Sequence, residues 1–594
     1  MLRASWQDRL RRLFARAPAP PATVALFEPG AWLAATVISL RSGRLDEAHA
    51  QAIARQADLP ADADALAILG AVERRYGRTG ARERLEQALA AAHAHAYAHA
   101  ELAMVLLEAG DTEAAADHCA LARTFSPADP AATVAVAITI AEARLATRRR
   151  DDEGALAALE DTGADAHQDP EWRLELAGVL SHLGRPAEAV TAYGAVLEQF
   201  PAHTAAWANR GLVFLSQLGD PARALEDFRR AVMLAPGSVA AQGNLALALA
   251  ELGRTDEALA HLDAQLAATP DAAEYRWNRA VLRLAEGGFA AGWDDYEARH
   301  QRTQGAAPRQ FPLPEWAGQA LAAGQPLLVY GEQGVGDEIM FASCVPEALM
   351  RAGAVVLECD ARLAPLFARS FPGLRVHGAP RDGDRRWLAA HPALACQSAI
   401  GSLPRFLRRT RAAFPAQGGY LQADPARVAH WRAWLASAGA GTTVGIAWRG
   451  GTAKSRAALR AMPLADWAPT FQVSGVRWVV LQQDAGADER ARIQTLTGTA
   501  PLVPEFPASD LDELAALVSA LDRVITVDNT LAHLAGALGR PVWIVLPQAA
   551  DWRWGRSGDR SVWYPAARLW RQAAAGDWSA VAKALAQTLQ SGPA

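Results

Sequence analysis

The chain has 594 residues, of which 51% are hydrophobic and 21% are charged, and its formal net charge is −5. This length exceeds what one hydrophobic core usually organises, so we expect two or three folded units and exclude a disordered chain. The slightly acidic balance lacks the clustered basic charge of a nucleic-acid-binding protein, so we expect no nucleic acid as a partner.

The cysteines and the first residues bear on the compartment. Four cysteines show no Cys-x-x-Cys pair and no metal-ligand spacing with histidine, and they predict reduced core residues of a cytoplasmic protein; they are Cys119, Cys344, Cys359 and Cys396. Residues 1–30 are expected to form a basic N-terminal helix and a linker, without the apolar stretch of a secretory signal. This start fits a solvated helix or a membrane-surface anchor, and of these we expect the solvated helix.

Residues 31–300 repeat a short motif in which a charged residue and an alanine closely follow a glycine. Most spacings are 33 to 35 residues, and the glycines are Gly43, Gly77, Gly110, Gly184, Gly219, Gly253 and Gly287. This is the tetratricopeptide period, in which helix pairs stack because one pair cannot bury its own apolar face. We predict an α superhelix of about seven or eight repeats. Its groove either holds an extended segment of another protein or is filled by its own chain.

The interval from Gly110 to Gly184 is twice as long as the others. It fits two repeats plus a short insertion around Arg148–Asp152, a charge run that we interpret as a solvated loop.

From about residue 310, short apolar runs alternate with helical patterns, which predicts parallel βα units. The expected strands are Pro326–Tyr330, Ala354–Cys359, Thr443–Trp448, Trp478–Gln482, Arg523–Val527 and Val542–Leu546. The expected helices are Asp337–Ala352, Asp510–Ala520 and Thr530–Leu538. A polar interval divides this region into halves, at 310–435 and 440–594. Ligands of such sheets bind beyond the carboxyl ends of the strands, so we expect chemistry in the loops after Tyr330, Trp448, Gln482 and Val527.

Residues 327–341 read as a strand, a glycine-rich turn and a helix. Gly334 and Gly336 allow a ligand to approach the backbone closely. Glu332, Asp337 and Glu338 place carboxylates at the helix start, where one could act as a general base. Alternatively, Asp337 and Glu338 only complement the helix dipole.

Residues 524–547 read as a buried strand, a polar turn and a helix of small residues, and N–H groups at such a helix start can bind phosphate. We expect Asn529 and Thr530 to face the phosphates, and Asp528 to cap the helix or to hold sugar hydroxyls. His533 is either a ligand contact or a hydrogen-bonded structural histidine.

Residues 447–464 place basic side chains in a loop after a strand. Lys454, Arg456 and Arg460 would neutralise the charge that develops on a leaving diphosphate. The alternative is a solvated basic loop.

Several segments, in order, resemble a bacterial family in which tetratricopeptide repeats precede a domain similar to the ADP-heptose heptosyltransferases, that is, to glycosyltransferase family 9. They are LPEW (313–316), GEQGVGDEIMF (331–341), TVDNTLAHLAGALGRPVW (526–543), DWRW (551–554) and WYPAARLWRQ (563–572). The resemblance implies an α/β GT-B fold of two Rossmann-like halves after the repeats. It also implies a nucleotide-sugar substrate bound mainly by the C-terminal half, with no further cofactor.

The resemblance also implies roles for single residues. Asp337 looks like the family's catalytic base, Lys454 and Arg460 like its phosphate contacts, and Gln482 like a contact near the base or ribose. The full set that we expect to bind the donor is Gly334, Gly336, Lys454, Arg460, Gln482, Asp528, Asn529, Thr530 and His533. The sugar would be transferred with inversion by direct attack, and no metal is expected. The family's Asp-Thr pair is Asp528-Asn529 here, which leaves the donor open.

The order of repeats and transferase is also similar to that of flagellin-modifying glycosyltransferases and, in layout, of protein O-GlcNAc transferases. We therefore expect a cytoplasmic enzyme that glycosylates Ser or Thr of a protein docked by the repeats, with flagellin as the first candidate acceptor. The alternatives are a heptosyltransferase-like enzyme acting on a cell-envelope glycan, whose basic start would bind membrane, and a non-catalytic tetratricopeptide scaffold. We do not expect a membrane as a partner.

Overall fold

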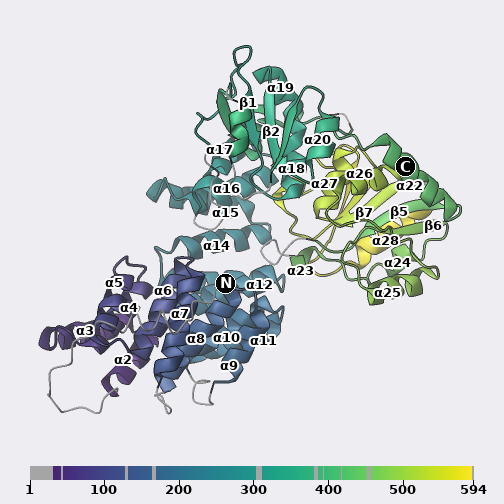
Figure 1. Ribbon diagram of the computed structural model, residues 1–594. Helices are drawn as coiled ribbons and strands as arrows, with labels where there is room; N and C mark the ends of the chain where they lie inside the picture. Colours follow the sequence, from purple (N-terminus) through teal and green to yellow (C-terminus); the bar gives the residue numbers. More distant parts are fainter. Residues whose placement is uncertain are drawn as a thin grey trace, which may run out of the picture. The chain divides into compact units, whose positions relative to one another are not determined.

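The computed structural model describes residues 31–41, 44–126, 132–162, 169–302, 309, 311–379, 385–391, 393–416, 418–450 and 457–591 (Figure 1). It divides into two compact units, Met1–Leu183 and Gly184–Ala594. The basic start that we predicted at residues 1–30 lies outside the described residues.

The described part of the first unit is helical. Its helices are α2 (Ala31–Arg41), α3 (Leu45–Asp58), α4 (Ala63–Arg75), α5 (Ala81–Ala91), α6 (Ala96–Glu108), α7 (Thr112–Phe125), α8 (Ala132–Arg148), α9 (Asp152–Glu160) and α10 (Pro170–His182). The second unit begins with α11 (Pro186–Gln199), α12 (Thr204–Ser216), α13 (Pro221–Leu234), α14 (Val239–Glu251), α15 (Thr255–Ala268), α16 (Ala273–Ala285) and α17 (Phe289–Tyr296). The described residues of the predicted repeat range therefore form helices, as expected for tetratricopeptide repeats.

The repeat glycines form the turns inside the repeats. All of them except Gly43, which lies outside the described residues, have a φ between 63° and 85°, a conformation that glycine adopts without strain. Between α8 and α9 the same place is taken by Arg150, with a φ of 63°. The charge run at Arg148–Asp152 is therefore the turn of a repeat, and our interpretation of it as an insertion was wrong.

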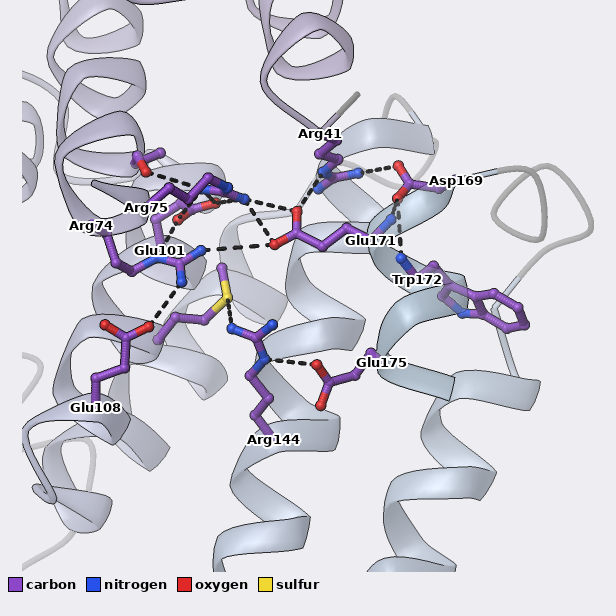
Figure 2. A network of polar contacts seen from close by, with 12 residues as sticks. Arg41, Arg74, Arg75, Glu101, Glu108, Arg144, Asp169, Glu171, Trp172 and Glu175 are labelled. Carbon is purple, nitrogen blue, oxygen red and sulfur yellow. Dashed lines mark hydrogen bonds and ion pairs between the residues drawn. The ribbon is translucent and has the colours of Figure 1, made fainter. Parts of the chain in front are cut away.

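The first helices of successive repeats in the first unit are joined by a buried network of charged side chains (Figure 2). Arg41 of α2 binds Asp169, the residue that caps the start of α10, at 2.8 Å, and Arg75 of α4 binds Glu171 of α10 at 2.7 Å. Arg75 also contacts Glu101 of α6, which is fully buried. Burial would raise the pKa of Glu171, but the surrounding guanidinium groups hold it well below its ordinary value. In the first unit, the faces of α2, α4, α6 and α10 that carry this network therefore contact one another through ion pairs within the protein.

The second unit continues with two parallel sheets, as predicted for a GT-B fold. The first has the order β3-β2-β1-β4, and the second has the order β6-β5-β7-β8-β9. Their strands are β1 (Leu327–Tyr330), β2 (Val355–Asp360), β3 (Arg375–Ala379), β4 (Cys396–Ala399), β5 (Thr442–Ala447), β6 (Val476–Val480), β7 (Arg523–Val527), β8 (Val542–Leu546) and β9 (Ala567–Arg571). The register pairs Leu327 with Val355 and Cys396 in the first sheet, and Val524 with Val542 in the second.

The helices of this region lie between the strands in the chain. They are α18 (Val335–Phe341), α19 (Val345–Ala352), α20 (Ala364–Ser370), α21 (Leu403–Leu407), α22 (Pro425–Ser437), α23 (Ala457–Arg460), α24 (Ala468–Phe471), α25 (Ala487–Thr497), α26 (Leu511–Ala520), α27 (Thr530–Ala537) and α28 (Ser579–Gln590). The helix predicted at Asp337–Ala352 is divided into α18 and α19 by a short 3₁₀ turn, with Pro346 in the first turn of α19.

The boundaries between the parts differ from those drawn on the sequence. Helix α22, which we assigned to the first half, packs on α26 of the second, where Glu513 accepts hydrogen bonds from Arg427 and Trp431 at 2.7 Å each. At the other end, Trp293 of α17 is 1% exposed and packs edge-to-face on Trp552 and Trp563, at 5.6 and 6.1 Å between ring centroids. The last repeat therefore shares one hydrophobic core with the α/β region.

Candidate functional site

The turn after β1 carries three acidic side chains, and the structure gives each a different environment. Glu332 is bound by Arg299 at 2.8 Å, and Glu338 is fully buried and accepts a hydrogen bond from the Asp360 N–H at 2.9 Å. Asp337 stands at the third position of α18, where its Oδ2 accepts from the Gly334 N–H at 3.3 Å. Its Oδ1 contacts the other half of the α/β region.

Five side chains of alternating charge connect the two halves. Nε of Arg553 lies 2.9 Å from Oδ1 of Asp337, and Nη1 of Arg553 lies 2.7 Å from Oδ1 of Asp551. Arg460 then bridges Asp551, at 3.5 Å, and Asp528, at 3.3 Å. We call Asp337, Arg553, Asp551, Arg460 and Asp528 the charge chain. It brings together three residues that we predicted for the site, and it adds Asp551 and Arg553, which we did not.

Burial sets the electrostatics of the charge chain. It raises the pKa of Asp528, with Arg460 opposing the shift. Burial would also raise the pKa of Asp551, but Arg553 and Arg460 hold it below the ordinary value. The charge chain contains three carboxylates and two guanidinium groups in close contact. An incoming anion could therefore compete with the protein's own carboxylates for the two guanidinium groups.

The start of α27 is capped by Asn529. Its Oδ1 accepts from the Ala532 N–H at 3.2 Å and from the Thr526 hydroxyl at 3.1 Å, and its Nδ2 donates to the Arg449 carbonyl at 3.3 Å. The helix cap that we considered for Asp528 is thus provided by its neighbour. These bonds use both ends of the Asn529 amide, and its contact with a donor phosphate stays a prediction.

The glycine-rich turn packs directly on α27. A Cβ atom at Gly336 would lie 3.1 Å from Cδ2 of His533 and 3.6 Å from Oγ1 of Thr530. Gly336 therefore lets α18 and α27 approach each other and places Asp337 next to the Asp528 loop.

His533 is held by aromatic neighbours. Its Nδ1 lies 2.9 Å from the Tyr564 hydroxyl, and its ring stacks on Trp554 at 5.0 Å between centroids. Burial, reinforced by Arg553, lowers its pKa to about 3, so the ring is neutral near pH 7. The sequence left open whether His533 contacts a ligand or is a hydrogen-bonded structural histidine. These contacts are those of a structural histidine.

Gln482 lies at the carboxyl end of the second sheet. Its Oε1 accepts from the N–H groups of Trp448 and Arg449 at 3.2 and 3.1 Å, and its Nε2 donates to Asp484 at 2.6 Å. A small cavity of about 90 Å³, which Phe506 and Arg490 also line, opens beside it. Lys454 and Arg456 lie outside the described residues.

A larger cavity of about 420 Å³ lies between the turn of the last repeat and the loop after β8. Four arginines line it, namely Arg411, Arg553, Arg556 and Arg560. The Arg556 N–H donates to the Ala285 carbonyl at 3.1 Å, so the last repeat directly supports the loop that carries Arg553.

A signal for Asp551 and Arg553 was present in the sequence. Both belong to the segment DWRW (551–554), which follows the predicted strand Val542–Leu546. The sequence-based prediction placed the chemistry in the loops after four other strands and not in the loop after this one. Strand order alone also could not show that this loop crosses to α18.

Comparisons with known proteins match the repeats and the second sheet separately. Tetratricopeptide repeat models match residues 77–130, 174–239 and 215–280, and the model of glycosyltransferase family 9 (heptosyltransferase) matches residues 465–548. The chain is 35% identical over 427 residues to Protein FlbA of Caulobacter vibrioides, which covers 69% of this chain and 71% of that protein.

Solved tetratricopeptide proteins are also similar to this chain. The tetratricopeptide protein YrrB is 19% identical with a TM-score of 0.21, and the match covers 32% of this chain and 95% of the YrrB chain. A tetratricopeptide repeat protein from Parabacteroides merdae is 22% identical with a TM-score of 0.29, and the match covers 34% of this chain and 77% of that protein's chain. Within the described residues, no helix has both the length and the apolar character needed to cross a bilayer.

Proposed function

The chain belongs to the family of tetratricopeptide-repeat proteins that carry a glycosyltransferase family 9 domain, and from this premise we propose that it glycosylates another protein. The donor is a nucleotide-activated sugar, and the acceptor is a Ser or Thr hydroxyl of a protein docked on the repeats. The observation that supports this most is the charge chain, in which a carboxylate at the start of α18 meets two arginines of the second half.

In the proposed reaction, Asp337 takes the proton of the acceptor hydroxyl while the oxygen attacks the anomeric carbon of the sugar. The bond from that carbon to the donor phosphate breaks, and its electron pair leaves with the nucleotide. Arg460 and Arg553 would neutralise the charge that develops on the phosphate, the role that a divalent cation has in other transferases. Direct attack inverts the anomeric configuration, and the step needs no metal.

A protein acceptor explains why a transferase carries so many repeats, because a small glycan acceptor needs no extended binding surface. Flagellin is the first acceptor to test. The four cysteines are buried and free, which agrees with a reducing compartment, and we propose the cytoplasm. The match to the heptosyltransferase model keeps an envelope glycan as the second candidate acceptor.

The two acceptors are distinguished by mass spectrometry of cells with and without the chain. Intact flagellin should lose the mass of one or more sugars when the chain is deleted, and the envelope glycan should keep its composition. The Asp488→Asn variant, altered at an exposed position of α25 outside the charge chain, should restore the flagellin mass. Unchanged flagellin together with a truncated envelope glycan would contradict the protein acceptor.

A further inference from the structure

Arg553 holds the carboxylate to which we assign the proton transfer. Its Nε and Nη2 both donate to Oδ1 of Asp337, and Oδ2 of the same carboxylate accepts from the Gly334 N–H. A general base needs a lone pair directed at the proton that it removes. In this arrangement both lone pairs of Oδ1 are engaged, so the guanidinium group must leave Oδ1 before Asp337 can accept a proton at that oxygen.

Arg553 is placed so that its side chain can exchange partners without losing its anchor. Its Nη1 is bound to Asp551 at 2.7 Å, and Asp551 belongs to the same loop. The loop itself is fixed, because Trp552 packs on Trp293 and the Arg556 N–H bonds to the Ala285 carbonyl. A small rotation of the guanidinium group would therefore release Asp337 while the contact with Asp551 persists.

We propose that Arg553 is a catalytic residue that exchanges Asp337 for the phosphate of the donor. A guanidinium group binds carboxylate and phosphate with the same planar set of donors, and phosphate carries more charge. Arg460, held between Asp528 and Asp551, is the second cation that the phosphate reaches. Donor binding then frees Oδ1 of the base, so the donor binds first and the acceptor hydroxyl is deprotonated by Oδ1 only beside a bound donor. This inference rests on the proposed function, since it takes the donor to be a nucleotide-activated sugar.

The exchange has a consequence for binding that does not depend on turnover. If Asp337 and an anion compete for Arg553, then removing the charge of Asp337 must tighten anion binding. A role of Asp337 in supporting the fold would instead leave anion binding unchanged or weaken it.

The test is the binding of inorganic pyrophosphate to the full chain, measured by calorimetry at low ionic strength. Asp337→Asn should bind pyrophosphate at least about threefold more tightly than the wild type, and Arg553→Met at least about tenfold more weakly. Arg553→Lys should bind with intermediate affinity. Arg556→Met is the control, because Arg556 lies in the same loop and pairs with Glu286, away from Asp337; its affinity should equal that of the wild type.

Thermal unfolding of each variant checks the fold. If Asp337→Asn unfolds, Asp551→Asn is the alternative, because it also removes a carboxylate that competes for the arginines and should also tighten binding. Unchanged or weaker binding by the folded Asp→Asn variant, or unchanged binding by Arg553→Met, would overturn the exchange. If the protein glycosylates another protein but Asp337 and pyrophosphate do not compete for Arg553, only the proposed exchange is contradicted. If they compete but no protein is glycosylated, only the proposed protein acceptor is contradicted.

Discussion

Nε of Arg553 lies 2.9 Å from Oδ1 of Asp337, and this ion pair connects a loop of the second sheet to the first helix of the first sheet. The two residues are 216 positions apart in the chain. Asp337 lies in the first turn of α18, shortly after β1, and Arg553 lies in the segment after β8, so both follow the carboxyl ends of parallel strands, which is where open α/β folds place their ligands. The pair thus marks the point at which the two halves could share one substrate.

The close approach of α18 and α27 predicts that Gly336→Ala destabilises the protein. The added Cβ would lie 3.1 Å from His533, so the helices must separate by a few tenths of an ångström, at a cost of about 1–3 kcal/mol. Alanine has the higher helix propensity by about 1 kcal/mol, so a net loss of stability can only come from this contact.

Gly334→Ala is the matched control for this substitution. Its Cβ would meet only Oδ2 of Asp337, at 3.4 Å, and its φ of −73° suits alanine. In thermal unfolding, Gly336→Ala should have the lower midpoint. Equal midpoints would show that the glycine is not needed for packing.

The turn at Arg150 predicts a stabilising substitution. Arg150 has the left-handed backbone that glycine occupies in the other described repeat turns, and this conformation costs a side-chain-bearing residue about 1–2 kcal/mol. Arg150→Gly should therefore stabilise the first unit by about 0.5–1 kcal/mol after the entropy of the unfolded glycine is subtracted. Arg148→Gly, at the last position of α8, should destabilise the same unit. Denaturant unfolding of both variants measures the difference, and a loss of stability in Arg150→Gly would contradict the assignment of this turn.

The buried network of the first unit predicts a large effect of Glu171→Gln. This substitution removes the one carboxylate that Arg41 and Arg75 share, so that Arg41 keeps only Asp169 and Arg75 keeps only Glu101 as a buried acidic partner. Loss of a partner from a buried ion-pair network costs about 3–5 kcal/mol. Glu86→Gln is the control, because Glu86 pairs with Arg82 on the exposed surface, where an ion pair contributes little to stability. Hydrogen exchange of residues 63–182 in the full chain reports the stability of this unit. Equal protection in both variants would contradict the network's role.

The first unit should also lose stability on acidification, in two ranges. Burial, together with His118, lowers the pKa of His99 to about 4, below the 6.5 of an unfolded histidine. The unfolded chain therefore binds the extra proton first, and stability falls as the pH drops from about 6.5 to 4. Glu101 and Glu171 have depressed pKa values, so their contribution is complete above about 4.5 and is lost below it. In denaturant titrations from pH 7 to 4, His99→Asn should flatten the loss of stability, and a wild-type stability that stays constant over this interval would contradict the assignment of His99.

The sequence predicted the elements that have strong local signals. The strands Arg523–Val527 and Val542–Leu546 agree with β7 and β8 to the residue, because both are rich in valine and isoleucine and have turn residues on either side. Strands β3, β4 and β9 were missed. Each is short and contains polar residues such as His377, Gln397 and Arg568, whose places are set by tertiary contacts.

The candidate site could be predicted only in part, for a similar reason. Asp337, Arg460 and Asp528 were recognisable from the motifs around them, and the structure places all three in the charge chain. Their connection through Asp551 and Arg553 depends on how the loop after β8 crosses to α18, and no local pattern encodes that path. The packing of Trp293 into the α/β core was missed because its helix continues the repeat pattern without interruption.

The most direct test of the central claim is transfer of sugar by the Asp337→Asn variant. The purified full chain is incubated with unmodified flagellin and a nucleotide-sugar extract, and the intact mass of flagellin is followed over time. Because Asp337 is assigned as the base, Asp337→Asn should slow the appearance of the sugar mass by about a hundredfold or more while flagellin still binds. The account predicts this loss with Asp488→Asn at the wild-type rate, and a variant Asp337→Asn that glycosylates flagellin at the wild-type rate would contradict it.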